Sequence, residues 1–230
     1  MKKNIRNFTL EELKKEFVEI GESVLRAEQV FKWTNQKTAA DFSEMTNIPK
    51  TLRSKLDEKY RISEIICGNR VKSRDGTEKF LWNLEDGTQI ESVLIRAKNR
   101  KTICISTQVG CKFKCPFCAS GMNGFVRDLE VSEIVGQILS VQRLCGLEIT
   151  NVVFMGMGEP LDNYDNLIKA IQIINHRDGI GIGARKITIS TCGVVPKILA
   201  LKDLGLQVEL SISLHSAVNG IRDELVPINK

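Results

Sequence analysis

The spacing of hydrophobic residues changes twice along the chain. In residues 1–60 apolar side chains recur at helical spacing. Thr9 and Glu12 have the spacing of a capping box, and Pro49 suits a first helical turn. The pattern therefore predicts a small helical domain, with helices beginning after Thr9, covering 26–35 and beginning near Pro49.

A second pattern, typical of β-strands, covers residues 61–100. Asp-Gly pairs at 75–76 and 86–87 lie between strand-like runs, which is a strong signal for hairpins. We expect a short antiparallel meander here. It ends in a basic connector, RAKNRK, at 96–101.

From residue 101 to residue 230 strands and helices alternate, which predicts an α/β fold with a parallel sheet, either open or barrel-like. Helices are expected from Ser132, near 164–175 and from Val195. In such folds the carboxyl ends of the strands share one edge, where ligands bind. The predicted strands cover 101–109, 149–157, 185–191 and 206–216.

Composition narrows the class of protein and the cellular compartment in which we expect it. The 230 residues are 42% hydrophobic and 27% charged, as in soluble globular proteins. We find no apolar run of membrane-spanning length and no secretory signal at the start, so we expect a cytoplasmic protein whose thiols stay reduced. The net charge of +5 is compatible with a polyanionic partner without establishing one.

Three cysteines, Cys111, Cys115 and Cys118, follow the first parallel strand with C-x3-C-x2-C spacing. Three thiolates on a four-iron cluster leave one iron open to a further ligand. The alternative is a structural zinc site, which normally has four protein ligands and would need Cys104 or Cys145 to complete it. Spacing favours the cluster, since zinc sites usually have two separated C-x2-C units and this chain has no second one.

Polar motifs follow the other three parallel strands. They are GMGEP at 156–160, STCG at 190–193 and SLHS at 213–216. With the cysteine loop they would meet at one edge of the sheet, which predicts an active site there. The remaining cysteines are expected to be packing residues: Cys67, Cys145 and Cys192.

Long segments that contain these motifs resemble a known family. The cysteine loop resembles the signature of the radical S-adenosylmethionine (SAM) superfamily. Four segments are similar to the RlmN-type adenine-C2 methyltransferases: 108–138, 151–166, 187–198, and 211–216 with 221–230. The N-terminal helices are similar to that family's RNA-contacting accessory domain. The resemblance implies a partial βα barrel, about four of six units, over residues 101–230.

The same resemblance implies the cofactors and the partners. The cofactors are a 4Fe-4S cluster and SAM. The substrates are 23S rRNA and tRNA, the electron donor is a protein such as flavodoxin or ferredoxin, and the enzyme is a monomer that does not bind membranes.

Residue roles carry over only where the motifs match. Cys111, Cys115 and Cys118 match the cluster ligands. Taken alone, Glu159 could be an ordinary acid at a helix N-terminus and His215 a packed core histidine; their shared position at strand ends favours binding. The implied SAM contacts are Gly158, Glu159, Ser190, Ser213, Leu214 and His215.

Two catalytic residues are implied for methyl transfer. Cys104 matches the family's second, resolving cysteine, and Glu91 matches a proton acceptor; otherwise they would be a buried strand cysteine and a solvent-facing acid. In this family a carrier cysteine takes a methyl group from SAM, and a deoxyadenosyl radical activates that group for addition to adenine. The second cysteine then releases the product and forms a disulfide. No cysteine here matches the carrier, so we expect a fragment or truncated product.

Two other functions remain possible at this point. A related adenine-C8 methyltransferase, which confers antibiotic resistance, shares the cluster and SAM motifs, although GEPLDN and STCGVVP look more like the C2 group. A non-catalytic, zinc-stabilised RNA-binding protein is the alternative from a different class.

Overall fold

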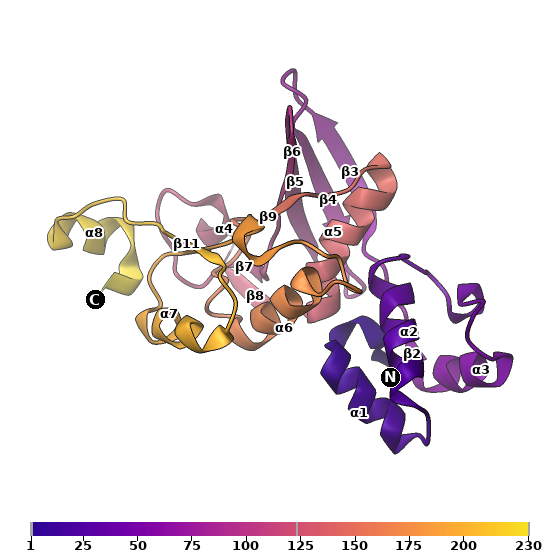
Figure 1. Cartoon of the computed structure of the whole chain (residues 1–230). Coiled ribbons are helices and arrows are strands. Elements are labelled where there is room, and N and C mark those ends of the chain that lie inside the picture. Colours follow the sequence, from indigo (N-terminus) through magenta and orange to yellow (C-terminus); the bar gives the residue numbers. More distant parts are fainter. Residues whose placement is uncertain (1, 123, 230) are drawn as a thin grey trace.

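The computed structural model describes residues 2–122 and 124–229, and its N-terminal part consists of three helices. They are α1 (Leu10–Glu19), α2 (Val24–Asn35) and α3 (Lys50–Lys59) (Figure 1). The capping box is confirmed, since the Thr9 hydroxyl accepts the Glu12 N–H and the Glu12 carboxylate accepts the Thr9 N–H. A parallel pair of two-residue strands, β1 (Lys3–Asn4) and β2 (Tyr60–Arg61), closes this part of the chain.

Across the described residues seven strands form one mixed sheet in the order β11-β10-β9-β6-β5-β4-β3. Strands β3 to β6 pair antiparallel, and the Asp-Gly hairpins are confirmed. Strands β6, β9, β10 and β11 pair in parallel, as expected. The members are β3 (Ile66–Lys72), β4 (Glu78–Asn83), β5 (Gln89–Ala97), β6 (Arg100–Cys104), β9 (Asn151–Phe154), β10 (Ile187–Thr191) and β11 (Glu209–Ile212).

The expected antiparallel meander is confirmed in β3, β4 and β5, and the basic segment at its end forms a hairpin turn. Residues 96–101 form the tip of a hairpin between β5 and β6, in which Ala97 pairs with Arg100. The strand-like alternation simply continues through a two-residue turn, so the meander becomes one half of the larger sheet. Arg96 is also engaged, because its guanidinium bonds the buried carboxylate of Glu78 at 2.7 Å.

The expected strand over 101–109 is also divided. β6 ends at Cys104, and β7 (Gln108–Gly110) pairs with β8 (Phe125–Asp128) in a second small sheet. The loop after β9 crosses the chain at this break, where the Gly156 N–H donates to the Ile105 carbonyl at 3.0 Å. A Cβ on Gly156 would lie 2.7 Å from that carbonyl carbon, so the crossing requires glycine.

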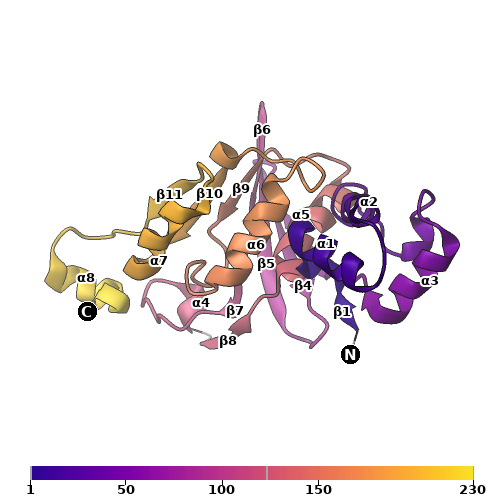
Figure 2. The same ribbon diagram turned by 60° about the horizontal axis from the view of Figure 1, so that its bottom comes forward.

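The main helices of the second half cover one face of the sheet (Figure 2). They are α5 (Val131–Cys145), α6 (Tyr164–Asn175) and α7 (Val195–Ala200). Alternate strand residues such as Ile103, Phe154 and Ile189 are fully buried against this layer. Their neighbours in sequence point to the opposite face, because side chains alternate along a strand. That second face carries the half-buried Cys104 and Ser190.

Short elements complete the fold. The short helices are α4 (Ala119–Met122) and α8 (Asn219–Leu225), and the 3₁₀ turns are Ile5–Asn7, Phe42–Glu44, Ala184–Lys186, Leu201–Leu204 and Pro227–Asn229.

No helix of the described residues is long and apolar enough to cross a membrane.

Candidate active site

The three motif cysteines lie on one loop between β7 and β8. Cys111, Cys115 and Cys118 are free, half-buried thiols. The Cys111 N–H donates to the Gly124 carbonyl at 3.0 Å, and the Cys118 N–H donates to the Cys115 carbonyl at 2.9 Å. These bonds close the loop on itself and hold the three thiols in one short stretch of chain.

Backbone sterics explain the shape of this loop. Gly110 has a φ of +75°, and a Cβ on it would lie 1.7 Å from the Gly124 carbonyl oxygen. Lys114, at the middle of the motif, also has a positive φ of +51°. The chain therefore enters the loop through a close crossing that only glycine permits.

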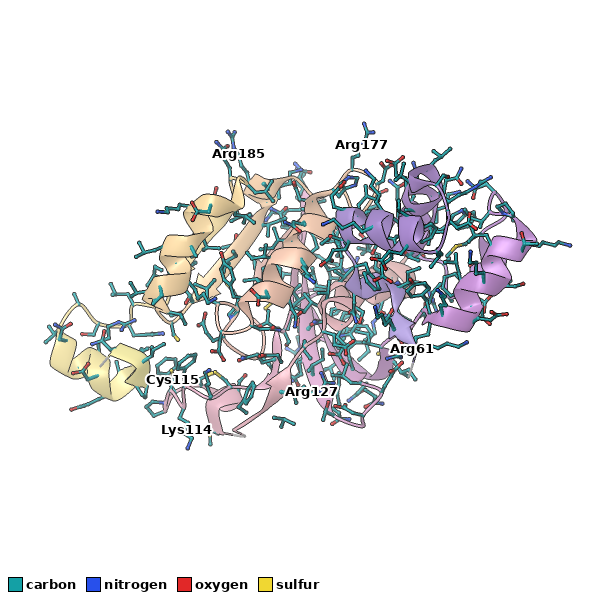
Figure 3. The ribbon with its side chains drawn as sticks, turned by 90° about the horizontal axis from the view of Figure 1, so that it is seen from below. Arg61, Lys114, Cys115, Arg127, Arg177 and Arg185 are labelled. Atoms are coloured by element: carbon teal, nitrogen blue, oxygen red, sulfur yellow. The ribbon has the colours of Figure 1, made fainter. Side chains whose placement is uncertain are left out.

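The thiols are close enough to influence one another. Burial raises the pKa of Cys111 and of Cys115, and the charges of neighbouring thiolates and of Glu159 raise both further. Arg222, on α8, opposes this rise at Cys115. Figure 3 shows Cys115 on the side of the loop toward α8.

The donor set fits a cluster. Metal binding converts thiols to thiolates and offsets the cost of their burial and mutual repulsion. Iron–sulfur clusters are held by thiolates, and Cys111, Cys115 and Cys118 are the residues that would hold one here. Within the described residues no three His, Cys, Asp or Glu side chains are gathered into a metal-binding group, so the fit rests on the donor type and on the spacing of the cysteines.

Gln108 joins the cysteine loop to the GMGEP loop. Its side chain is fully buried, and its Oε1 accepts the Glu159 N–H at 2.9 Å. Its Nε2 donates to Asp128 at 2.8 Å and to Asp162 at 2.9 Å. Gly158 has a φ of +93°, and a Cβ there would lie 2.5 Å from the Gln108 Cβ. The glycine of the GE pair thus makes room for Gln108.

Glu159 is held by backbone N–H groups from two segments. The residue is 4% exposed; its Oε1 accepts the Leu161 N–H at 3.0 Å, and its Oε2 accepts the Cys192 N–H at 2.8 Å. The carboxylate therefore links the ends of β9 and β10. A carboxylate oxygen that already accepts one N–H can still accept a bond from a cation through its second lone pair.

The ends of β10 and β11 lie next to each other. Ser190 pairs in register with Ser211, and the Ser213 N–H donates to the Thr191 carbonyl at 2.8 Å. Beyond them His215 has a φ of +59°, and its ring lies 4.3 Å from that of Phe117 in the cysteine loop. The 213–216 segment thus reaches the cysteine loop through His215, which is an exposed residue rather than a core histidine.

The side chain of Leu214 does not contact the other motifs as closely as its neighbours do. Its side chain is 53% exposed, although its two neighbours in sequence approach the other motifs. Its N–H donates to the Ile212 carbonyl at 2.9 Å, so its backbone is held by a local turn.

Cys104 and Glu91 share the sheet face opposite the helices. Cys104 pairs with Val93, and Glu91 lies two residues before Val93 on the same strand and therefore on the same face. Burial raises the pKa of the Cys104 thiol. The Glu91 carboxylate, 41% exposed, bonds Lys79 at 2.9 Å. The structure brings the two residues to one face without a direct bond between them.

Three residues of this region were missed or misread in the sequence. Cys192, expected to be only a packing residue, contributes backbone groups to the site. Gln108 and Arg222 were not predicted at all. A polar residue at a buried strand position just before the cysteines could have indicated Gln108, whereas the position of Arg222 depends on a distant contact.

A cleft of about 440 Å³ lies between the β1–β2 pair, the turn between β4 and β5, strand β8 and the start of α5, and none of the three motif cysteines lines it. Its two arginines, Arg61 and Arg127 (Figure 3), are paired with acids: Arg61 with Glu85, and Arg127 with Asp86 at 2.6 Å. Because these charges are already neutralised, the cleft is a poor phosphate site.

The three-cysteine loop follows β6, the first of the parallel strands, with only the short strand β7 between them. The family model for the Radical SAM superfamily matches residues 105–228, and that for the "Ribosomal RNA large subunit methyltransferase N-terminal domain" matches residues 3–62. The chain belongs to the radical SAM superfamily and, within it, to the RlmN family.

Two relatives and one solved structure illustrate the similarity. Proteins described as "Probable dual-specificity RNA methyltransferase RlmN" are 51% identical over 99% of this chain in a Thermoanaerobacter species and 50% identical over 99% in Thermotoga maritima. The chain covers 66% and 67% of their lengths. The crystal structure of a radical SAM methyltransferase from Sphaerobacter thermophilus superposes with a TM-score of 0.90 at 39% identity, covering 99% of this chain and 68% of that one.

We predict that Gln108→Glu destabilises the protein by about 2–4 kcal/mol. The new carboxylate cannot donate to Asp128 and Asp162, and it adds a third negative charge beside them. Urea unfolding measures the loss. Gln172→Glu, an exposed change on α6, is the matched control and should stay within about 0.5 kcal/mol of the wild type. Equal midpoints for the two variants would contradict the role given to Gln108.

Proposed function

We propose that this chain binds a 4Fe-4S cluster and SAM and belongs to an enzyme that methylates C2 of adenosine in 23S rRNA and tRNA. The chain spans about two thirds of the length of the curated relatives that it matches, so this activity is a proposal for the whole protein. The main support is a loop with three half-buried thiols beside the buried carboxylate of Glu159, whose charge raises the pKa of two of those thiols.

The cysteine loop holds the cluster in this proposal. Cys111, Cys115 and Cys118 each supply one thiolate. When bound, the cluster supplies the electron that cleaves SAM and leaves one iron free for its amino and carboxylate groups. The chain's own contribution is the fixed loop, shaped by the crossing at Gly110.

The methionine end of SAM would bind at the GE pair. Glu159 accepts hydrogen bonds from the ammonium group, and its orientation is set by the N–H groups of Leu161 and Cys192. Gly158 permits the close approach to Gln108. The other contacts come from the ends of β10 and β11: Ser190, Ser213, Leu214 and His215.

Methyl transfer uses the uncovered face of the sheet. Cys104 is the resolving thiol, and Glu91 accepts the proton that adenine loses at C2. Because burial raises the pKa of Cys104, its thiol keeps its proton until a base removes it. Glu91 can act only when its ion pair with Lys79 opens or leaves a lone pair free.

The organisation of the chain follows from these roles. Residues 1–60 contact RNA, and residues 101–230 hold the cluster and SAM. Residues 61–100 connect these two parts of the chain. We further propose a cytoplasmic monomer that receives electrons from a flavodoxin or ferredoxin. The rival C8 methyltransferase shares the cluster and SAM residues, so only the methylated product separates the two.

We predict about four irons per chain after anaerobic reconstitution. Cys115→Ala should lose most of that iron and the brown absorption, because a ligand is removed from the loop. Cys67→Ala, on β3 outside the loop, is the control and should keep both. Zinc in place of iron, or full iron content in the Cys115 variant, would refute the ligand assignment.

We also predict which products form when the reconstituted chain is given SAM, a reductant and an RNA containing the target adenosine. Deoxyadenosine should appear, because the residues for SAM cleavage are present. The resemblance places the methyl carrier on a cysteine in a later loop, and none of the seven cysteines matches it, so methylated adenosine should not form. Mass spectrometry of digested RNA detects C2- and C8-methyladenosine separately. Methylation by this chain alone would mean that one of its seven cysteines is the carrier.

A further inference from the structure

Arg222, on α8, is a buried charged residue that the proposed chemistry does not use. The residue is 9% exposed and lies near the C-terminal end of the described chain. Burying a guanidinium is costly unless its donors are bonded, so its contacts indicate what it stabilises.

The guanidinium of Arg222 connects two segments. Its Nη2 donates to the Cys192 carbonyl at 2.7 Å, and its Nη1 donates to the side-chain oxygen of Asn229. Asn229 in turn donates to Asp223 at 2.6 Å. A planar guanidinium can hold both partners at once, whereas a lysine ammonium is a single point of charge on a flexible stem.

The other side of Cys192 contacts Glu159. The Cys192 N–H donates to Glu159 Oε2 at 2.8 Å, so this one residue bonds Arg222 through its carbonyl and Glu159 through its N–H. The following turn is shaped for this contact: Gly193 has a φ of +121°, and a Cβ on it would lie 3.3 Å from Arg222 Nη2. The Gly193 N–H donates to the Thr191 hydroxyl at 3.0 Å, which fixes the turn from its other end.

We propose that Arg222 is a positioning residue for the SAM-binding carboxylate: it holds the backbone of Cys192, and Cys192 holds Glu159. This inference rests on the proposed binding of SAM at Glu159. With the Cys192 carbonyl fixed, the backbone torsions of that residue are limited and its N–H stays directed at the carboxylate. Arg222 acts through Cys192 and does not itself contact SAM.

SAM binding and iron content together test this role. Arg222→Lys keeps the charge but cannot span both partners, and we expect SAM affinity to fall at least ten-fold with iron per chain unchanged. Equilibrium dialysis against labelled SAM measures the affinity of the reconstituted protein. Arg185→Gln is the matched control, since this exposed arginine bonds only the side chain of Gln207 among the described residues and lies far from Cys115 in Figure 3. The control should bind SAM as the wild type does.

A double-mutant cycle separates positioning from general support of the fold. If Arg222 acts through Glu159, adding Arg222→Lys to Glu159→Gln should weaken SAM binding little beyond Glu159→Gln alone. Additive losses, or wild-type affinity in Arg222→Lys, would overturn the inference. So would loss of cooperative unfolding or of iron in Arg222→Lys, since the residue would then be structural. Failure of the wild type to bind SAM would instead overturn the proposed function.

Discussion

The arrangement of the site depends on the buried side chain of Gln108. One amide group accepts the Glu159 N–H and donates to Asp128 and Asp162, so it joins the strand before the cysteines, the strand after them and the GE loop. A buried amide with all three bonds made is stabilising, and the loss of any partner leaves an expensive unpaired group. Gly158 lies against this side chain with a positive φ. Any larger residue at position 158 would displace the side chain of Gln108. The motif glycine and glutamate are therefore placed by a residue that belongs to neither motif.

Negative charge is concentrated around Gln108 and Glu159. Glu159 is almost fully buried, and a bound cluster would add three thiolates close to it. The fold compensates with backbone N–H groups directed at the carboxylate and with the buried guanidinium of Arg222. Such a site favours a ligand with a positive group, which SAM carries on its amino end. The basic tip of the β5–β6 hairpin begins the strand that ends at Cys104, so its charges lie at the opposite end of the sheet from the cysteine loop.

Local patterns in the sequence predicted the local structure and the ligand-bearing loop. The Thr9 capping box, the two Asp-Gly hairpins and the parallel strands ending in polar motifs depend on neighbouring residues, and the structure has all of them. The features that were missed depend on residues far apart in sequence. Gln108 meets Glu159 across 51 positions, and Arg222 meets Cys192 across 30. The break after Cys104 has the same origin, because it is set by the loop that crosses at Gly156 rather than by the strand-like residues themselves.

The central claim is that the cysteine loop and Glu159 together form one site for a cluster and SAM. Mössbauer spectroscopy of the reconstituted chain, with and without SAM, tests it most directly. The account predicts about four irons, of which one changes its spectrum when SAM is added, because three are capped by cysteine thiolates and one is open. It also predicts that Glu159→Gln keeps the irons but weakens the SAM-dependent change. A cluster whose spectrum is the same with and without SAM in the wild type would contradict the account.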